Sequence, residues 1–399
     1  MAAALILIVV LAVLHQLRGP VFSVGRPLPS GKVKPQLVSD ADTAVLLAPD
    51  GSLWAWGGKE SRLSYLFPHP KLSQIPLRLT ADSNWLQVAG GGKVTLALKN
   101  DGSLWAWKRS SDGQSVQTSL TAHYSVPTRI GTETDWIQIS VAGDHRVALK
   151  SDGSLWTWGE NDPTRIGQDR DWRNIAAGQF ATYALKTNGT LWGWGAVIGD
   201  LGRIGDPRQL DPDTNWLTIS AHSYTLMALK TDGTLWLTPG QPLVSSKFSQ
   251  YGQDRDWAEV YPGTFASFAR KKDGGWWGMG LNIGGQLGFG TNSFRRTTLQ
   301  PLPFGFEPWA FAPGQFTTLL LTKDGKLWTW GARLGLEKTS RMGRKIEDFF
   351  WPVAGRFRPL RAFYDRGFDL KPHLLWELPP DVRRSLGIEP NSATNNFAN

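Results

Sequence analysis

The 399-residue sequence contains no cysteine. This absence excludes disulfides, thiolate nucleophiles and thiolate metal ligands, and it leaves the redox compartment undetermined. The six histidines form no H-x-H or H-E-x-x-H spacing, so no zinc site is predicted. A G-x-S-x-G elbow, a phosphate loop and a Ser-His-Asp order are also missing. We therefore predict no catalytic residue, no metal and no cofactor.

Long hydrophobic runs are scarce as well. Residues 2–14 form an apolar run of 13 residues, the length of a secretory h-region and shorter than the roughly 20 residues of a bilayer span. No basic n-region precedes it and no Ala-x-Ala site follows it. We expect residues 1–20 to be a signal peptide or a membrane anchor, with membrane contact through residues 2–16, and the protein to be exported or membrane-anchored. Basic residues after the run leave the side of the membrane open.

The remaining composition favours a turn-rich all-β chain with a sizeable core, because 41% of the residues are hydrophobic and the chain has 44 glycines and 25 prolines. The formal net charge of +9 favours anionic partners. The basic residues form no long stripe interleaved with aromatic residues, so nucleic acid is not the expected partner.

One phrase occurs seven times. It reads DGSLWAWG at 50–57, and its turn glycines fall at positions 51, 102, 153, 189, 233, 274 and 325. Steps of 36 to 51 residues are typical of propeller blades. Asp-Gly or Asn-Gly between alternating strands predicts a tight hairpin, because both central residues of its turn need a positive φ.

Each copy after the first is preceded by a tryptophan, which we call the landmark tryptophan. These residues are Trp85, Trp136, Trp172, Trp216, Trp257 and Trp309, and each lies 15 or 16 residues before the turn Asp or Asn. The spacing predicts one strand from the landmark, a second before the turn and a third after it, with the first two strands of blade 1 in 36–48. A proline-bearing outer strand is predicted at 76–79, 127–130, 163–166 and 207–210.

The sequence thus predicts an all-β fold, a seven-bladed β-propeller of four-stranded antiparallel blades over 36–363. An N-terminal apolar segment precedes it and an irregular, partly disordered C-terminal tail follows at 364–399, where 374–388 is a candidate docked helix. The last blade takes its fourth strand either from 358–363 or from 21–28, so residues 21–35 are a linker or a ring-closing strand. We expect a monomer.

Tryptophan is abundant, with 21 residues, of which 13 follow the turn in the third strand and only Trp351 and Trp376 fall outside the pattern. Because neighbouring blades cover both faces of a blade, we expect these indoles to pack between blades. Acidic turns such as DRDW at 169–172 and 254–257 suggest either calcium or capping of the turn by side-chain-to-backbone bonds; few oxygens and an arginine inside two turns favour capping.

The turn, the Trp-Gly pairs and the spacing resemble the regulator-of-chromosome-condensation repeat family in its Trp-rich form. Residues 280–291, GLNIGGQLGFGT, are similar to that family's longer signature, and the resemblance covers about 36–331. It implies the propeller fold and the use of a propeller face to bind another protein. The family includes a nucleotide exchange factor, an ultraviolet photoreceptor and secreted enzyme inhibitors, and the photoreceptor's Gly-Trp-Arg-His-Thr signature is absent here.

Unequal connections after the third strand predict a binding surface. They are long in blades 1, 2 and 6, and the tail follows blade 7, so they should form a crescent on one face. The candidate partner-binding residues in this crescent are Tyr65, Phe67, His69, Lys108, Arg109, His123, Tyr124, Phe294, Arg295 and Arg296. We expect a non-enzymatic protein-interaction module, inhibitor-like in one version. The alternatives are an enzyme with its site at the channel mouth, and a regulator that binds nucleic acid or a nucleotide-binding protein.

Overall fold

The computed structural model describes residues 33–39, 43–57, 76–91, 94–108, 127–143, 145–158, 163–179, 181–195, 204–223, 225–238, 248–282, 284–290, 293–315, 317–332 and 368–388. The predicted signal or anchor at 1–20 lies outside this part of the chain. Within it, no helix combines the length and the apolar character needed to span a bilayer.

The described residues form seven separate four-stranded antiparallel sheets, each built from four consecutive strands, which confirms the predicted fold. The strands of blades 1 to 3 are β1 Gln36–Ser39, β2 Thr43–Leu47, β3 Leu53–Gly57, β4 Leu77–Arg78, β5 Trp85–Gly91, β6 Val94–Lys99, β7 Leu104–Lys108, β8 Thr128–Ile130, β9 Trp136–Ala142, β10 His145–Lys150, β11 Leu155–Trp158 and β12 Thr164–Ile166. Those of blades 4 to 7 are β13 Trp172–Ala177, β14 Ala181–Lys186, β15 Leu191–Gly195, β16 Ile204–Asp211, β17 Trp216–His222, β18 Thr225–Lys230, β19 Leu235–Leu237, β20 Ser249–Tyr251, β21 Trp257–Tyr261, β22 Ala266–Lys271, β23 Trp276–Asn282, β24 Ser293–Pro301, β25 Pro308–Pro313, β26 Thr317–Thr322, β27 Lys326–Ala332 and β28 Phe368–Glu377.

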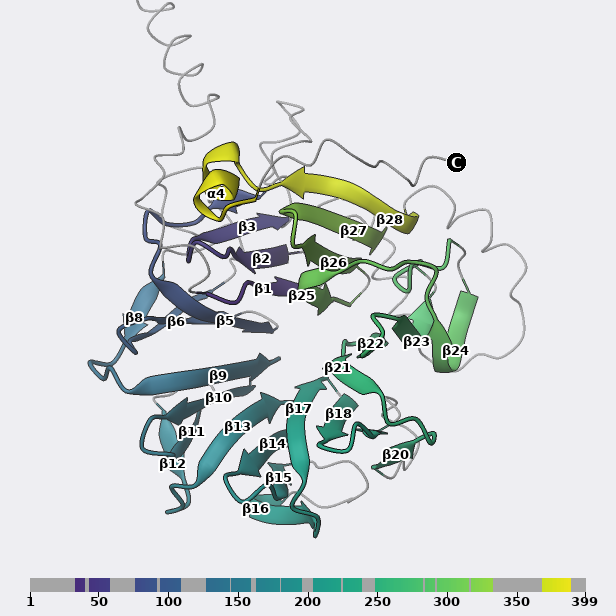
Figure 1. Ribbon diagram of the computed structural model, residues 1–399. Helices are drawn as coiled ribbons and strands as arrows, with labels where there is room; N and C mark the ends of the chain where they lie inside the picture. The colour runs from purple at the N-terminus through teal and green to yellow at the C-terminus, as the bar shows by residue number, and fades with distance from the viewer. Residues whose placement is uncertain are drawn as a thin grey trace, which may run out of the picture.

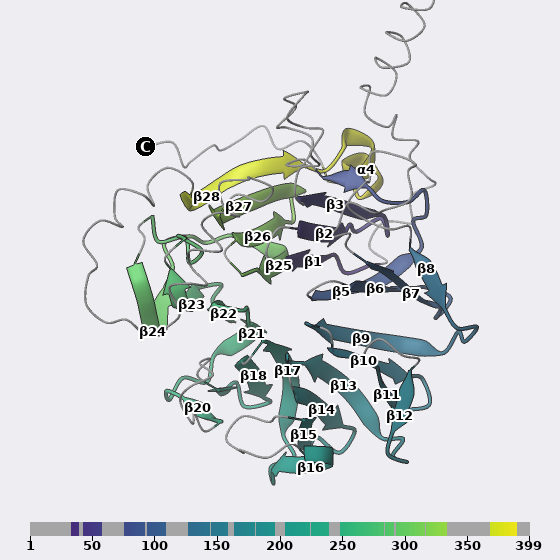
Figure 2. The same ribbon diagram turned by 180° about the vertical axis from the view of Figure 1, so that it is seen from behind.

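The sheets are arranged around a central axis, with the first strand of each blade innermost (Figures 1 and 2). Because the strands of a blade alternate in direction, its connections fall on two faces. The turn face carries the Asp-Gly hairpins and the links from one blade to the next. The insert face carries the connections from first to second strand and from third to fourth strand.

The turn glycines are required by conformation and by a close approach. Gly153 has a φ of +77°, and a Cβ built on it would lie 2.0 Å from the carbonyl oxygen of Arg170, in the link to the next blade. At the next turn, the N–H of Trp216 donates to the carbonyl oxygen of Gly189 at 3.3 Å. The hairpin of one blade is thus a docking point for the next.

The Ser or Thr after the turn glycine links the turn to the third strand. Asp101 Oδ1 accepts the backbone N–H of Ser103 at 2.9 Å and its hydroxyl at 2.5 Å, and Ser103 Oγ accepts the indole N–H of Trp105 at 2.8 Å. The same three bonds recur in blades 1, 4 and 5. The repeated phrase is therefore a structural unit, as predicted.

The tryptophans pack between blades. Trp85 and Trp107 of blade 2 are 1% and 2% exposed and contact Val45 and Leu53 of blade 1 in one cluster. The same arrangement joins blade 2 to blade 3 and blade 3 to blade 4. Burying an indole removes about 150–250 Å² of surface from water, so these contacts are a main source of ring stability.

Blade 7 departs from the predicted register. Pro308 pairs with Thr322, as Trp85 pairs with Lys99 in blade 2, so Trp309 lies one residue beyond the landmark position. The tryptophan spacing predicted Trp309 as the landmark, but the pairing of the first and second strands puts Pro308 at that position. Blade 7 therefore lacks a landmark tryptophan.

The fourth strand of blade 7 also differs from the prediction. It is β28, which runs antiparallel to β27 and lies in what was predicted to be the tail, while the two candidates, 358–363 and 21–28, lie outside the described residues. The propeller therefore extends beyond residue 363. Trp376 of β28 lies 5.2 Å from Trp54 of blade 1, measured between ring centroids.

A short helix, α4 (Pro380–Ser385), follows β28 and is the later part of the predicted helix at 374–388. Leu378 and Val382 are 1% and 2% exposed, and they belong to the same core cluster as Ala48 and Trp54 of blade 1. Blade 1 has no landmark tryptophan, and this C-terminal segment fills the equivalent place. The C-terminal segment thus adds to the direct packing of β1 on β25 and β26 at the ring closure, and no strand N-terminal to β1 takes part among the described residues.

Candidate functional site

Most of the predicted partner-binding residues lie in the long connections between the third and fourth strands. Tyr65, Phe67, His69, Arg109, His123 and Tyr124 lie outside the described residues. Lys108 is the last residue of β7. Their proposed role therefore remains a prediction.

Phe294, Arg295 and Arg296 belong to β24, which corrects the predicted long loop of blade 6, whereas their role in partner binding stays a prediction. The exposed side chain of Arg296 lies over the ring of Phe289, with its guanidinium carbon 5.2 Å from the ring centroid. The connection of blade 6 is consequently short, spanning 283–292, and is comparable to 238–248 in blade 5.

The predicted family signature explains why this connection is compact. Asn282 and Gln286 are fully buried, Asn282 Oδ1 accepts the N–H of Leu287 at 2.8 Å, and Gln286 Oε1 accepts the N–H of Gly284 at 2.9 Å. The carbonyl oxygen of Gln286 accepts the indole N–H of Trp330 in blade 7 at 2.9 Å. The signature therefore joins blades 6 and 7.

Long connections from third to fourth strand remain in three consecutive blades. They span 333–367 in blade 7, 58–76 in blade 1 and 109–127 in blade 2. Blades 3 and 4 have 159–163 and 196–203. The crescent on the insert face is thus narrower than predicted, since blade 6 does not contribute.

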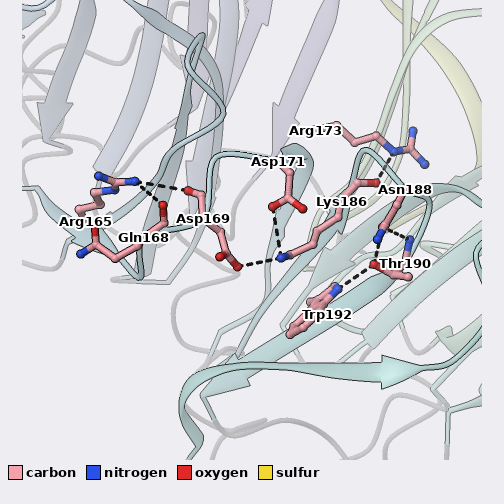
Figure 3. A network of polar contacts seen from close by, with 9 residues as sticks. All are labelled: Arg165, Gln168, Asp169, Asp171, Arg173, Lys186, Asn188, Thr190 and Trp192. Atoms are coloured by element: carbon pink, nitrogen blue, oxygen red, sulfur yellow. Dashed lines mark hydrogen bonds and ion pairs between the residues drawn. The ribbon is translucent and has the colours of Figure 1, made fainter.

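The acidic turns surround a lysine at the end of the second strand. In blade 4, Lys186 Nζ lies 2.7 Å from Asp169 Oδ2 and 3.2 Å from Asp171 Oδ1 (Figure 3). The same ammonium lies 4.8 Å from the ring centroid of Trp172 and 4.6 Å from that of Trp192. Each of blades 2 to 6 has such a lysine over two indoles, namely Lys99, Lys150, Lys186, Lys230 and Lys271.

The carboxylates favour the charged form of Lys186 and Lys271. Burial opposes the charge of Lys186, but the hydrogen bonds to Asp169 and Asp171 outweigh it and raise its pKa. The hydrogen bond to Asp254 raises the pKa of Lys271. The predicted capping of these turns is therefore corrected. The carboxylates of DRDW at 169–172 bind the ammonium of Lys186 in the same blade and not chiefly the backbone of the turn.

Polar side chains on the insert face lie between the inner strands. His222 Nε2 lies 2.9 Å from the hydroxyl of Thr264, and His145 Nε2 contacts the hydroxyl of Thr182, in each case across a blade boundary. Burial lowers the pKa of His145 and so favours its neutral form. Over the described ranges, no three His, Asp or Glu side chains gather in a way that could hold a metal ion.

The sequence prediction missed a second surface, on the turn face. In blades 2 to 7 the first strand has a β-bulge at its start; in blade 2, Trp85 pairs with Lys99 and Gln87 with Leu98, so Leu86 is the extra residue. The equivalent residues form what we call the bulge ring: Leu86, Ile137, Arg173, Leu217, Ala258 and Trp309. The signal in the sequence was the recurrent apolar residue after the landmark tryptophan.

Comparison with known proteins agrees with this architecture, although no family model matches the chain. The chain is 32% identical over 157 residues to the mitochondrial RCC1 domain-containing protein RUG3 of Arabidopsis thaliana, covering 36% of this chain and 34% of that protein. It is 27% identical over 128 residues to the ultraviolet-B receptor UVR8 of the same plant, covering 31% and 29%. The aligned region thus spans about a third of the length of these relatives.

A solved structure shows the same fold over most of the chain. Prp20p from Saccharomyces cerevisiae superposes with a TM-score of 0.58 at 16% identity, covering 78% of this chain and 85% of that one. The sequence likeness covers a part of the repeats, and the structural likeness covers the ring of seven sheets. Together with the repeated Asp-Gly turn, these likenesses show that the chain is a seven-bladed β-propeller whose repeats are similar to those of RCC1-like proteins.

Proposed function

We propose that this protein is a non-enzymatic protein-interaction module that presents the insert face of blades 7, 1 and 2 to a partner protein. The observation that carries the proposal is the unequal length of the third-to-fourth-strand connections, which are long in three neighbouring blades and short in the others. Insertions confined to one face of a repeat fold commonly build its binding surface.

The chemistry of these connections supports a protein as the partner. Residues 58–76 contain Tyr65, Phe67 and His69, and residues 109–127 contain His123 and Tyr124. Aromatic side chains are common anchors of protein interfaces, because they bury a large area with few rotatable bonds. An inhibitor that occupies the site of another protein is one form that such a module takes.

The relatives support the same class of function. Prp20p binds Gsp1p and histones, and UVR8 is a receptor for ultraviolet-B. Relatives of this fold thus act through binding or regulation, and we extend only that general role to this chain.

Shortening of the long connections tests the proposal. In one variant, residues 58–76 and 109–127 are each replaced by the connection of blade 3, 159–163; a control variant receives the same connection in blade 4, in place of 196–203. We expect affinity capture followed by mass spectrometry to lose specific partners with the first variant and to keep them with the control. Equal recovery by the full chain and the first variant would refute the proposal, provided that both melt at similar temperatures.

We further propose that residues 1–20 direct the protein to export or hold it at a membrane. The apolar run at 2–14 supports this proposal. Fractionation of cells that express the full chain, compared with a variant lacking residues 1–20, tests it. Identical distribution of the two proteins would contradict it.

A further inference from the structure

The bulge ring places apolar side chains in solvent at equivalent positions of neighbouring blades. Leu86, Ile137 and Leu217 are 40%, 51% and 50% exposed, and only one other large hydrophobic side chain in the described ranges, Leu374, is comparably exposed. A β-bulge redirects the extra residue out of the regular alternation of the strand. The bulge in each of these first strands therefore accounts for the exposure of Leu86, Ile137 and Leu217.

Packing within the propeller does not require an apolar residue at this position. Blade 4 has Arg173 there, which is exposed and donates to the carbonyl oxygens of Lys186 at 2.9 Å and Trp216 at 2.5 Å. Blade 6 has Ala258, which is also exposed. Arginine and alanine are thus compatible with the bulge, so the fold itself does not require aliphatic residues at the other positions.

The three aliphatic residues lie on one arc of the ring. They belong to β5, β9 and β17, and the intervening β13 contacts both β9 and β17. The first strands of these blades lie side by side around the axis in both views (Figures 1 and 2). The arc is therefore one surface made by blades 2 to 5 on the turn face.

Exposed carboxylates border this arc, and the exposed Arg173 lies between Ile137 and Leu217. Asp82, Asp135 and Asp213 have side chains that are 50%, 43% and 52% exposed, whereas their lysine partners are only 11%, 10% and 5% exposed. The ammonium groups thus lie beneath the carboxylates. Of the arginines near the arc, Arg170 is paired with Asp152, whereas Arg129 and Arg173 donate to backbone carbonyl oxygens and keep their positive charge.

From these observations we propose that the arc of the bulge ring, formed by Leu86, Ile137 and Leu217, binds a basic polypeptide segment whose apolar side chains cover the three aliphatic residues. Lysine or arginine side chains of that segment pair with the exposed carboxylates at the edge of the arc. This surface lies on the face opposite the long connections, so it is independent of the proposed function and can fail or hold separately.

The probe is a labelled synthetic helical peptide of leucine and lysine, about 18 residues long, which is about five turns. We expect it to bind the full chain, with binding that weakens as NaCl rises from about 50 to about 300 mM because the charges are screened. A peptide with glutamate in place of lysine is expected to bind at least about tenfold more weakly, and so is one with serine in place of leucine. The excess positive charge of the whole chain alone would give the opposite preference between lysine and glutamate.

The variant is the triple substitution Leu86→Ser, Ile137→Ser and Leu217→Ser, and the control is Leu374→Ser, an exposed leucine of β28. We expect the triple variant to bind the leucine–lysine peptide at least about tenfold more weakly and the control to bind it unchanged. Amide hydrogen exchange of the unmodified chain should show protection by the peptide in 85–91, 136–142 and 216–222. This measurement decides the matter if the triple variant does not fold.

Three results would overturn the proposal. The first is no binding of the leucine–lysine peptide, or equal binding by the triple variant. The second is equal or tighter binding of the glutamate peptide. The third is protection confined to segments of the insert face, which would move the site to the surface of the proposed function.

Discussion

The backbone N–H of Leu378 donates a hydrogen bond of 2.8 Å to the carbonyl oxygen of Gly325, the turn glycine of blade 7. Trp85, Trp136 and Trp216 make the same bond to the turn glycine of the preceding blade, at 3.2 to 3.3 Å. The segment after β28 thus enters the position where an eighth blade would begin. It ends there in α4, and its apolar side chains cover blade 1.

Disrupting the packing of this segment on blade 1 should destabilise the propeller. Replacing Val382 by aspartate puts a charge where the side chain is 2% exposed, and we expect a loss of about 2–4 kcal/mol in the free energy of unfolding. Urea unfolding followed by tryptophan fluorescence measures the change. Arg384→Asp, on the exposed side of the same helix, is the control, and equal midpoints for both variants would contradict the closing role of the segment.

The turn glycines allow conformational cost to be separated from steric cost. Gly153 and Gly167 both have a positive φ, of +77° and +59°, but a Cβ on Gly167 would meet nothing within 4 Å. We expect Gly167→Ala to cost about 1–2 kcal/mol from φ alone, and Gly153→Ala to cost clearly more because of the carbonyl oxygen of Arg170. Chemical denaturation measures both. Similar losses of stability for the two variants would show that the backbone at Arg170 shifts at little cost to accommodate the added methyl group.

Acid should destabilise the hairpins. The hydrogen bond from the hydroxyl of Ser103 lowers the pKa of Asp101, and those from Ser154 and Thr234 do the same for Asp152 and Asp232. A depressed pKa in the folded state contributes stability above the unfolded value of about 4, and this contribution is lost as the pH falls through the folded value. Stability should therefore decline between about pH 5 and pH 2.

The triple substitution Asp101→Asn, Asp152→Asn and Asp232→Asn tests this assignment. Asparagine fits the turn, because Asn188 Oδ1 accepts the same bonds from Thr190 in blade 4, at 3.1 and 2.7 Å. We expect the variant to lose less stability than the unmodified chain over the acidic range. Parallel pH profiles of the two proteins would assign the acid sensitivity to other carboxylates.

The buried lysines should stabilise the blades at neutral pH. Lys186→Met keeps the contact with Trp172 and Trp192 but removes the charge, and we expect a loss of about 1–2 kcal/mol. Because the folded pKa of Lys186 is raised, its contribution is present below the unfolded value of about 10.4 and is lost as the pH rises through the folded value. Urea unfolding at neutral and strongly alkaline pH measures this.

The difference between Lys186→Met and the unmodified chain should therefore shrink at alkaline pH. Lys323→Met is the matched control, since the side chain of Lys323 is 67% exposed. A loss for Lys186→Met that does not depend on pH would mean that packing, not the ion pairs, accounts for the effect.

Local patterns in the sequence determined the strands and turns of a single blade. The Asp-Gly turn, the alternation of Leu53, Trp54, Ala55 and Trp56, and the proline before Thr128 each depend on neighbouring residues, so the hairpins, the number of blades and most outer strands could be predicted. The packing of tryptophan between blades also followed, because a narrow sheet cannot bury its own faces.

Tertiary structure alone decided the remaining features. The register of Trp309, the pairing of β28 with β27 and the cover of blade 1 by α4 depend on partners far away in the chain. The lysine between Asp169 and Asp171 and the exposure of Leu86 likewise arise only when strands align and a bulge forms. A residue and its sequence neighbours set the local turn and strand preferences. Burial, strand pairing and surface charge depend on the distant segments that the closed ring brings into contact with that residue.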